Sequence, residues 1–511
     1  MMSEMTDGQP ILRTDAYARA LDARDARFDG LFFVGITTTR IYCRPVCPAR
    51  ISFPDRRRFF RSAAAAERAG FRPCLRCRPE LAPGRAIVYA VSRLARAAAY
   101  RIAAGALNGR SVGDLASELG VSERHLRRSF EREIGVTPLE LALTHRLLLA
   151  KRLLADTKLS ITQIAYASGF QSLRRFNAVF RERYRMCPSE LRRPTREGAR
   201  SAAVDLQRGA ADTGDFVRLT LAYRPPLDWD VLLDHLGRDA VSGIDVVEGR
   251  RYGRTVRLEG RSGVLFAQDA TPPAGTNGDR PSRPYLEVDL STGLLPVLMP
   301  AIARLRQLFD LDAEPSLIDA HLEQAGLGSL VRRHPGVRIP GGADAFDVVL
   351  RTVLRGCCRS GEGSSALDAV VSALGEPIDT GFAALTRLAP SAERVAQLGA
   401  ADLVVLGVSA RQAAAIVAVA RALTAGALRL EPGSDVSSTL RALLDSCVGE
   451  RAATLIVMRT LSWPDAFPTC DPALLRAARV SSEGELRELA EQWQPWRGYA
   501  AQHLWLQNAS D

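Results

Sequence analysis

The chain has 511 residues, of which 47% are hydrophobic and 24% are charged, so a globular protein of three or four domains is predicted. No run of about 18 apolar residues occurs and the N-terminal stretch is polar and acidic, which argues against a membrane-spanning helix and a signal peptide. Nine cysteines without a secretion signal fit the reducing cytoplasm.

The net charge of +11 is unevenly distributed along the chain. Residues 1–200 hold 37 Arg and Lys against 19 Asp and Glu, a balance of +18, whereas the remainder holds 31 against 38, a balance of −7. A strongly basic first part is typical of proteins that bind nucleic acid. An Arg-rich, solvated surface is the alternative interpretation of the same charge.

Two close pairs of cysteines stand near the N-terminus. Cys43 and Cys47 have Cys-x3-Cys spacing, and Cys74 and Cys77 have Cys-x2-Cys spacing. Two such pairs separated by a short segment predict a closed tetrahedral site for one zinc ion, the metal that four thiolates favour. A purely structural zinc site is the simplest interpretation of the spacing alone, and two disulfides fit a chain of this kind less well.

The sequences around these cysteines, IYCRPVCPAR and FRPCLRCRPE, resemble the N-terminal domain of the Ada family over about residues 12–83. The resemblance implies that Cys43 accepts a methyl group from a methylphosphotriester in DNA, with the other three cysteines as the remaining ligands. A zinc-bound thiolate is deprotonated at neutral pH and still nucleophilic. Because methylation removes one negative charge from the site, it should strengthen the attraction to DNA phosphates.

Helical patterns follow after Pro83-Gly84. The stretch 111–135 predicts two helices with a tight turn at Gly120 and with Ser122 as the cap of the second helix. A similar pattern returns at 160–193, and a long apolar helix over about 139–154 is predicted between the two units.

Two helix-turn-helix units joined by a helix resemble the AraC family of transcription activators over about residues 106–193. The resemblance implies recognition helices at about 122–133 and 171–183, and an activator that acts on promoter DNA with RNA polymerase. The residues predicted to face DNA are Arg124, Arg127, Gln171, Ser172, Arg174 and Asn177. The Pro-Cys-His-Arg motif of Ada's guanine methyltransferase does not occur in the sequence, so guanine repair by methyl transfer is not predicted.

The second half begins with a polar, apolar-poor stretch at 195–215 that is predicted to be a linker. Alternating patterns then predict an antiparallel sheet, with a Pro-, Gly- and Asn-rich loop at 271–284 and helices from Leu294 to the end. The strands are predicted within 216–229, 254–269 and 283–291.

This half resembles the AlkA-type 3-methyladenine DNA glycosylases through YRPPLDW, HPGVRIPGGADAFDVVLRTVL and WQPWRGYAAQHLW. The resemblance implies a small sheet domain and a helix-hairpin-helix domain, which flips a damaged base out of the duplex and hydrolyses its glycosidic bond. The predicted domains are a zinc methyl-acceptor domain (1–83), an AraC-type domain (84–194), a linker (195–215), a sheet domain (216–301) and a helix-hairpin-helix glycosylase domain (302–511).

Excision of a cationic alkylated base requires a carboxylate near the sugar, which stabilises an oxocarbenium-like transition state. The resemblance places this carboxylate at Asp471, with Asp465 as the less favoured neighbour. By its chemistry alone, an Asp that precedes a proline is more often a helix cap. Trp505 is predicted to stack on the flipped base, whereas Trp493 and Trp496 are predicted to pack in the interior.

The hairpin is predicted at 443–461, where Val448 and Gly449 would present backbone N–H groups to a DNA phosphate. The resemblance implies a glycine at Cys447, and a cysteine there is strained if the position needs a positive φ. The sequence also departs from the family around 355–359, and Arg451 replaces an aromatic residue that commonly starts the second hairpin helix.

Together these patterns predict an α+β multidomain protein: a small zinc-bound α/β domain, an all-α double helix-turn-helix domain, an antiparallel-sheet domain and an all-α helix-hairpin-helix domain. The predicted activities are excision of alkylated bases by a DNA-3-methyladenine glycosylase II and single-turnover methyl acceptance from methylphosphotriesters. The alternative is a regulator of the alkylation response whose glycosylase-like half is not catalytic. The predicted partners of this cytoplasmic monomer are double-stranded DNA and RNA polymerase, without a membrane.

Overall fold

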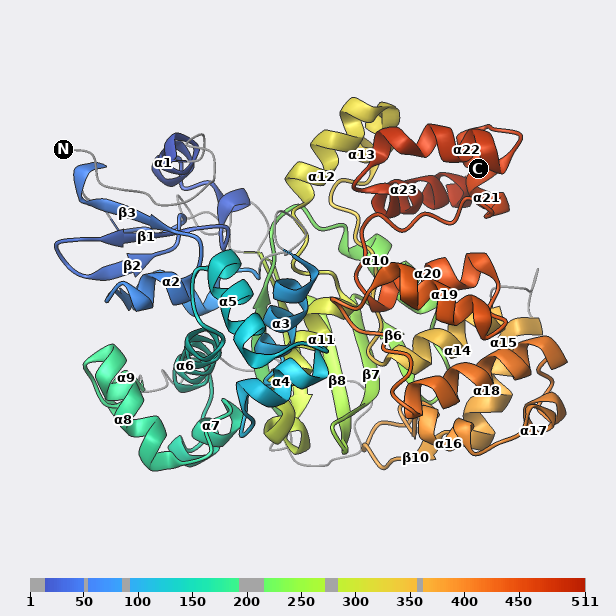
Figure 1. Cartoon of the computed structure of the whole chain (residues 1–511), viewed down its shortest axis with the longest axis horizontal. Helices are drawn as coiled ribbons and strands as arrows, with labels where there is room; N and C mark the ends of the chain where they lie inside the picture. The colour runs from blue at the N-terminus through green and yellow to red at the C-terminus, as the bar shows by residue number, and fades with distance from the viewer. Residues whose placement is uncertain are drawn as a thin grey trace.

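The computed structural model describes residues 14–49, 54–84, 92–192, 216–271, 284–355 and 362–510. The predicted linker at 195–215, most of the loop at 271–284, and Cys357 and Cys358 lie outside these residues. Figure 1 shows the parts in chain order, with the N-terminal sheet in blue, the following helices in cyan and green, a central sheet, and the C-terminal helices in orange and red. Among the helices that the structure describes, none is long and apolar enough to cross a membrane.

The N-terminal part is a four-stranded sheet of order β3-β1-β2-β4. Its elements are α1 (Thr14–Asp22), β1 (Phe33–Ile36), β2 (Ile41–Cys43), β3 (Arg57–Phe60), α2 (Ala63–Arg68) and β4 (Arg72–Pro73). β2 and β4 run parallel, with Tyr42 opposite Pro73, so the carboxyl ends of both strands lie at one edge of the sheet. This register brings Cys43 and Cys74 together.

Within residues 92–192 the second part consists of seven helices: α3 (Arg93–Ala103), α4 (Val112–Glu118), α5 (Glu123–Ile134), α6 (Pro138–Asp156), α7 (Ile161–Ala167), α8 (Leu173–Tyr184) and α9 (Pro188–Leu191). The predicted turn and cap are confirmed, since Gly120 has φ +70° and the Ser122 hydroxyl accepts from His125 N at 3.3 Å. The long helix is α6, which lies between the two helix-turn-helix units as predicted.

A five-stranded antiparallel sheet of order β5-β9-β8-β7-β6 follows. Its strands are β5 (Phe216–Ala222), β6 (Asp245–Glu248), β7 (Arg251–Leu258), β8 (Arg261–Asp269) and β9 (Tyr285–Ser291). The prediction missed the edge strand β6, whose four residues are too short for a clear alternation, and helix α10 (Trp229–Arg238), which lies between two predicted strands in a stretch that the prediction assigned to no element.

The C-terminal part is mostly helical. Its helices are α11 (Leu298–Leu308), α12 (Pro315–Leu322), α13 (Gly328–Arg333), α14 (Ala345–Arg355), α15 (Glu362–Leu374), α16 (Ala392–Ala396), α17 (Ala400–Val405), α18 (Ala410–Thr424), α19 (Val436–Asp445), α20 (Glu450–Thr460), α21 (Pro472–Ala478), α22 (Glu483–Ala490) and α23 (Arg497–Ser510). The prediction of helices to the end is wrong at one place, where β10 (Glu376–Pro377) pairs with β11 (Arg387–Leu388).

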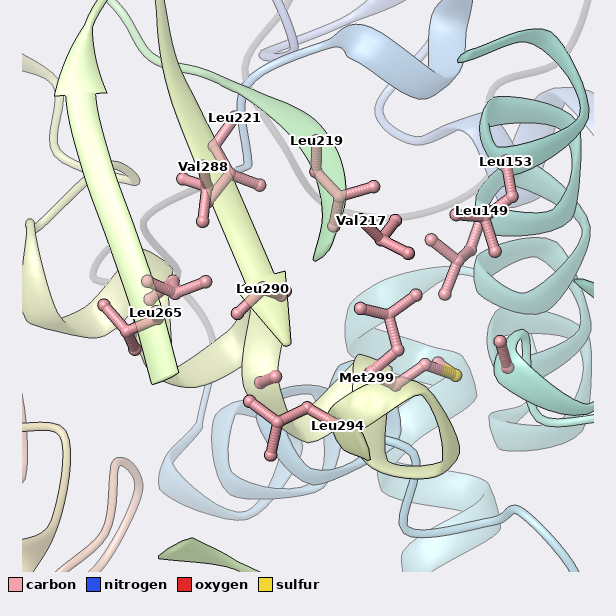
Figure 2. Close-up of a cluster of buried hydrophobic side chains, with 14 of the residues drawn as sticks. Leu149, Leu153, Val217, Leu219, Leu221, Leu265, Val288, Leu290, Leu294 and Met299 are labelled. Carbon is pink, nitrogen blue, oxygen red and sulfur yellow. The ribbon is translucent and has the colours of Figure 1, made fainter. Parts of the chain in front are cut away.

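One hydrophobic core joins the helix-turn-helix part to the central sheet. Leu149 and Leu153 of α6 belong to the same buried cluster as Val217 and Leu219 of β5 and Met299 of α11, as Figure 2 shows. Burial of such side chains contributes roughly 2 kcal/mol each. The helix-turn-helix part and the central sheet therefore pack against each other through a shared core.

A second contact joins helix α3 to the segment that leads into α19. Arg93 and Arg101 of α3 form ion pairs with Asp435 and Glu431. Between these pairs the backbone approaches so closely that a Cβ on Gly433 would lie 2.5 Å from the Cα of Ala97. Residues 93, 97 and 101 are four apart, so one stripe of α3 makes the whole contact.

This contact predicts an unequal effect of two glycine substitutions. Gly433 and Gly426 have similar φ angles, +92° and +71°, but nothing lies within 4 Å of a Cβ on Gly426. We expect Gly433→Ala to lower the free energy of unfolding by about 1–3 kcal/mol more than Gly426→Ala, because only Gly433→Ala adds overpacking to the φ strain. Denaturant unfolding of both variants measures the difference, and equal losses would show that α3 is not held against this segment.

Candidate metal centre, DNA-binding helices and carboxylate site

The four clustered cysteines form a compact, buried set. One Sγ from each of Cys43, Cys47, Cys74 and Cys77 lies within 4.8 Å of the other three. Zinc–thiolate bonds of about 2.3 Å in a tetrahedron place sulfur atoms about 3.8 Å apart, so the arrangement fits a zinc ion with only small side-chain adjustments. The parallel pairing of β2 and β4 creates the site by delivering one cysteine of each pair to the same edge.

Backbone N–H groups reach three of the four sulfur atoms, including that of Cys47, which accepts from Ala49. Arg44 N donates to Cys77 Sγ at 3.4 Å, and Arg76 N donates to Cys74 Sγ at 3.3 Å. Among the described residues, no backbone N–H donates to Cys43 Sγ. The Arg44 side chain is 2% exposed, forms an ion pair with Asp29 and donates to Cys77 O at 3.2 Å, so a buried cation lies beside the thiolates. Cys43 therefore differs from Cys74 and Cys77 in that its sulfur accepts no backbone hydrogen bond among the described residues.

Helix α6 touches the metal-binding loop directly. Lys151 Nζ donates to Cys74 O at 3.3 Å and forms a buried ion pair with Glu80. Arg78, the residue after Cys77, donates to both carboxylate oxygens of Asp156 at 2.7 and 2.8 Å. The helix that connects the two helix-turn-helix units is thus tied to the backbone that carries the ligands.

The predicted DNA-facing residues lie on or next to α5 and α8. Arg124, Gln171 and Arg174 are exposed, and Asn177 is half-buried. Arg127 is half-buried and donates to Glu123 at 2.7 Å. They belong to two different helix-turn-helix units, one that contains α5 and one that contains α8.

The second recognition helix begins later than predicted. α8 starts at Leu173, so Gln171 and Ser172 precede it, and the Ser172 hydroxyl caps it by accepting from Arg175 N at 3.4 Å. Sequence reasoning also missed Arg132, which with Arg124 and Arg128 lines a shallow depression along α5. The sequence could have indicated Arg132, because Arg124, Arg128 and Arg132 are spaced four residues apart and so lie on one face of the helix.

Asp471 is the N-cap of α21 and is 1% exposed. Its Oδ1 accepts from Ala473 N at 2.7 Å, and its Oδ2 accepts from Arg451 Nε at 2.6 Å. The structure thus gives Asp471 the geometry of a helix cap and adds a cation that the sequence analysis did not pair with it. Asp465 is held differently, since both of its oxygens accept from Arg497 at 2.7 and 2.8 Å.

The predicted hairpin is the α19–α20 unit. Cys447 is exposed and has φ +62°, so the cysteine occupies a left-handed position that favours glycine. Val448 is 3% exposed, which leaves only its backbone for a ligand. Gly449 is the N-cap of α20, and nothing lies within 4 Å of a Cβ placed there, so the start of the helix is open.

The tryptophans near the C-terminus pack into one cluster. Trp493 and Trp496 are 2% and 4% exposed, which confirms the prediction that they pack in the interior. Trp505 lies on α23 and is half-buried against the same cluster, and α23 packs against α21, the helix that Asp471 caps.

Comparison with known proteins agrees with this arrangement. Residues 16–80 match the metal binding domain of Ada, residues 115–194 match a helix-turn-helix domain, and residues 218–344 match the AlkA N-terminal domain. Together with the thiolate site and the α+β fold, these matches define a DNA-binding repair protein in which Ada-type and AlkA-type parts are fused.

One relative spans nearly the whole chain. The "Probable bifunctional transcriptional activator/DNA repair enzyme AlkA" of Mycobacterium tuberculosis is 35% identical over 493 residues, which are 95% of both chains. The chain therefore belongs to this family of bifunctional transcriptional activators and DNA repair enzymes. Two partial relatives from Escherichia coli match its separate parts. "DNA-3-methyladenine glycosylase 2" is 28% identical over 56% of this chain and 96% of the relative, and "Bifunctional transcriptional activator/DNA repair enzyme Ada" is 34% identical over 25% and 34%.

These findings confirm the predicted fusion, the α+β fold class and a site for one zinc ion. They also confirm that the chain is a DNA repair enzyme that binds DNA. The individual site residues, the domain boundaries, the oligomeric state and the contact with RNA polymerase remain predictions.

Proposed function

We propose that this protein repairs and senses DNA alkylation through two separate sites. The carboxylate of Asp471 supports hydrolytic excision of alkylated bases such as 3-methyladenine, and Cys43 accepts methyl groups from methylphosphotriesters. The two helix-turn-helix units bind promoter DNA, and the protein acts there as a monomeric activator with RNA polymerase. The observation that carries the excision site is the position of Asp471, a buried carboxylate fixed at the N-terminus of α21, the helix that follows the hairpin in the chain.

At the excision site, the fixed carboxylate faces the positive charge that develops on the sugar as the glycosidic bond breaks. A carboxylate already held in place stabilises this charge without reorganisation, an effect worth several kcal/mol. The Ala473 N–H holds one oxygen in position. The open start of α20 at Gly449 offers backbone N–H groups to a phosphate of the same strand, which would anchor the flipped nucleotide.

At the methyl-acceptor site, the Cys43 sulfur forms an S–CH3 bond while the O–CH3 bond of the phosphotriester breaks. The bonding electron pair stays on the phosphate oxygen, which restores an ordinary phosphodiester anion. Bound zinc would keep the four thiolates deprotonated at neutral pH. The N–H···S hydrogen bonds to Cys74 and Cys77 withdraw charge from those sulfurs, so Cys43 keeps the greater nucleophilicity.

A second candidate function is a regulator whose AlkA-type half only binds DNA. The observation in its favour is that both oxygens of Asp471 already have partners, Ala473 and Arg451. Release of 3-methyladenine and 7-methylguanine from methylated duplex DNA by the full-length protein separates the two functions. A regulator releases neither base, and it keeps its promoter response when Asp471 is replaced.

The helix-turn-helix proposal predicts the effect of one exposed arginine. We expect Arg124→Ala to weaken binding to promoter DNA by about 1–3 kcal/mol and to reduce its salt dependence, because the guanidinium on α5 contacts a base or phosphate. Arg411→Ala is the control, since Arg411 is an exposed arginine on α18, far along the chain from the recognition helices. Binding titrations at several salt concentrations would refute this role of α5 if both variants behaved alike.

A further inference from the structure

Arg451 has no role in the functions described so far, although it is the nearest charged group to the proposed catalytic carboxylate. It is the second residue of α20, and its Nε lies 2.6 Å from Asp471 Oδ2. The Arg451 side chain is 36% exposed, whereas the Asp471 side chain is 1% exposed. The carboxylate is thus buried beneath a cation whose other side reaches solvent.

This arrangement places a positive charge where a damaged base would lie. If Asp471 stabilises the sugar, the anomeric carbon lies within roughly 4 Å of the carboxylate, as favourable Coulomb interaction requires. The guanidinium is bonded to that carboxylate, so it lies within roughly 7 Å of the reacting carbon and of the attached base. The length of the Arg451 side chain keeps its charge near the site even if the ion pair opens.

We propose that Arg451 is a specificity-determining residue that discriminates against cationic alkylated bases in favour of neutral damaged bases. The proposal rests on the proposed function, because it takes Asp471 as the carboxylate of the excision reaction. An Asp471–Arg451 pair is neutral as a unit, so it attracts a cationic base much less than a lone carboxylate would.

The size of the effect follows from the charges. A unit charge at roughly 7 Å, at an effective dielectric constant of about 20 and after screening by salt, changes an equilibrium constant by about tenfold. In the 3-methyladenine nucleotide the positive charge lies on the base before cleavage and moves to the sugar as the glycosidic bond breaks, so one unit of positive charge lies near Arg451 in both the ground state and the transition state. Such uniform repulsion raises KM and leaves kcat unchanged.

A neutral damaged purine such as hypoxanthine responds differently. It carries no net charge when it binds, so Arg451 does not oppose its entry. As its glycosidic bond breaks, negative charge develops on the leaving base and equal positive charge on the sugar, so the nucleotide stays neutral overall and the guanidinium exerts no net repulsion on it in the transition state. The same residue therefore separates the two classes of substrate by charge alone.

The test compares the wild type with two substitutions at position 451. Arg451→Gln removes the charge but keeps an N–H group that can donate to Asp471, and Arg451→Lys keeps the charge. Full-length proteins act on methylated duplex DNA, from which 3-methyladenine release is measured, and on a duplex with one hypoxanthine. Asp471→Asn serves as the inactive control in both assays.

We expect Arg451→Gln to lower KM for 3-methyladenine release by about tenfold, to leave kcat unchanged and to leave KM for hypoxanthine within about twofold of the wild type. Arg451→Lys should match the wild type on both substrates. The proposal is overturned if Arg451→Gln changes both substrates equally, changes neither, or loses both activities while Asp471→Asn still abolishes release. A wild type that releases neither base, or an Asp471→Asn variant that stays active, rejects the proposed function itself.

Discussion

Replacement of Asp471 by Asn is expected to reduce the release of 3-methyladenine and 7-methylguanine by about 1,000-fold or more. Asn has nearly the same size and shape as Asp, so the substitution removes the negative charge and its ion pair with Arg451 but keeps the shape of the side chain. Loss of one preorganised electrostatic group from a buried site commonly lowers kcat by a factor of about 100–1,000, and here the lost group carries a full charge. High-performance liquid chromatography of the released bases measures this rate.

The structure predicts that this variant folds. Asn is as good an N-cap as Asp, so its side-chain oxygen still accepts from Ala473 N at the start of α21. The variant loses the ion pair with Arg451, but Arg451 is 36% exposed and water can replace the carboxylate, so the loss of stability is about 1 kcal/mol. Thermal unfolding of the variant should stay close to that of the wild type.

Asp465→Asn is the matched control. Asp465 is a nearby carboxylate, but both of its oxygens are bonded to Arg497, which fixes the start of α23. We expect this variant to retain base release within about tenfold of the wild type, since its role is structural. If Asp465→Asn abolished release and Asp471→Asn did not, Asp465 would be the carboxylate that supports excision and Asp471 would be only a helix cap.

The features that the sequence predicted well are those set by neighbouring residues. The Cys-x3-Cys and Cys-x2-Cys spacings fixed the thiolate cluster, and Ser122 and Gly120 marked a cap and a turn. Each of these signals depends on geometry within a few residues, so it survives in any tertiary context. The same holds for Asp471, whose position before a proline predicted a helix cap.

The features that the sequence did not predict depend on segments that are distant in the chain. The ion pair of Arg101 with Glu431 joins residues 330 positions apart, and Lys151 meets the Cys74 carbonyl 77 positions away. Hydrophobic periodicity reports which face of a helix is buried, but not what covers it. The Arg451–Asp471 pair was missed because the sequence does not show which side chains from different helices meet, although both residues had been singled out separately.

Replacement of Cys43 is expected to abolish methyl transfer from methylphosphotriesters, because we assign the accepting sulfur to Cys43 among the four clustered thiolates. Cys43→Asp is the informative variant, since a carboxylate can still bind zinc but cannot form a stable thioether. We expect it to keep one zinc ion per chain and to gain no methyl mass after incubation with methylated DNA. Intact-protein mass spectrometry and metal analysis measure both quantities.

The control must separate loss of the acceptor from loss of a ligand. Cys47→Asp removes one thiolate from the same cluster but leaves Cys43, so it should still gain a methyl group if its zinc is retained. Cys187→Ala should behave as the wild type, since Cys187 lies outside the cluster, at the start of α9. Peptide mapping of the methylated wild type decides the assignment directly. A methyl group found on Cys74 or Cys77 would mean that the N–H···S hydrogen bonds do not set the order of nucleophilicity among these thiolates.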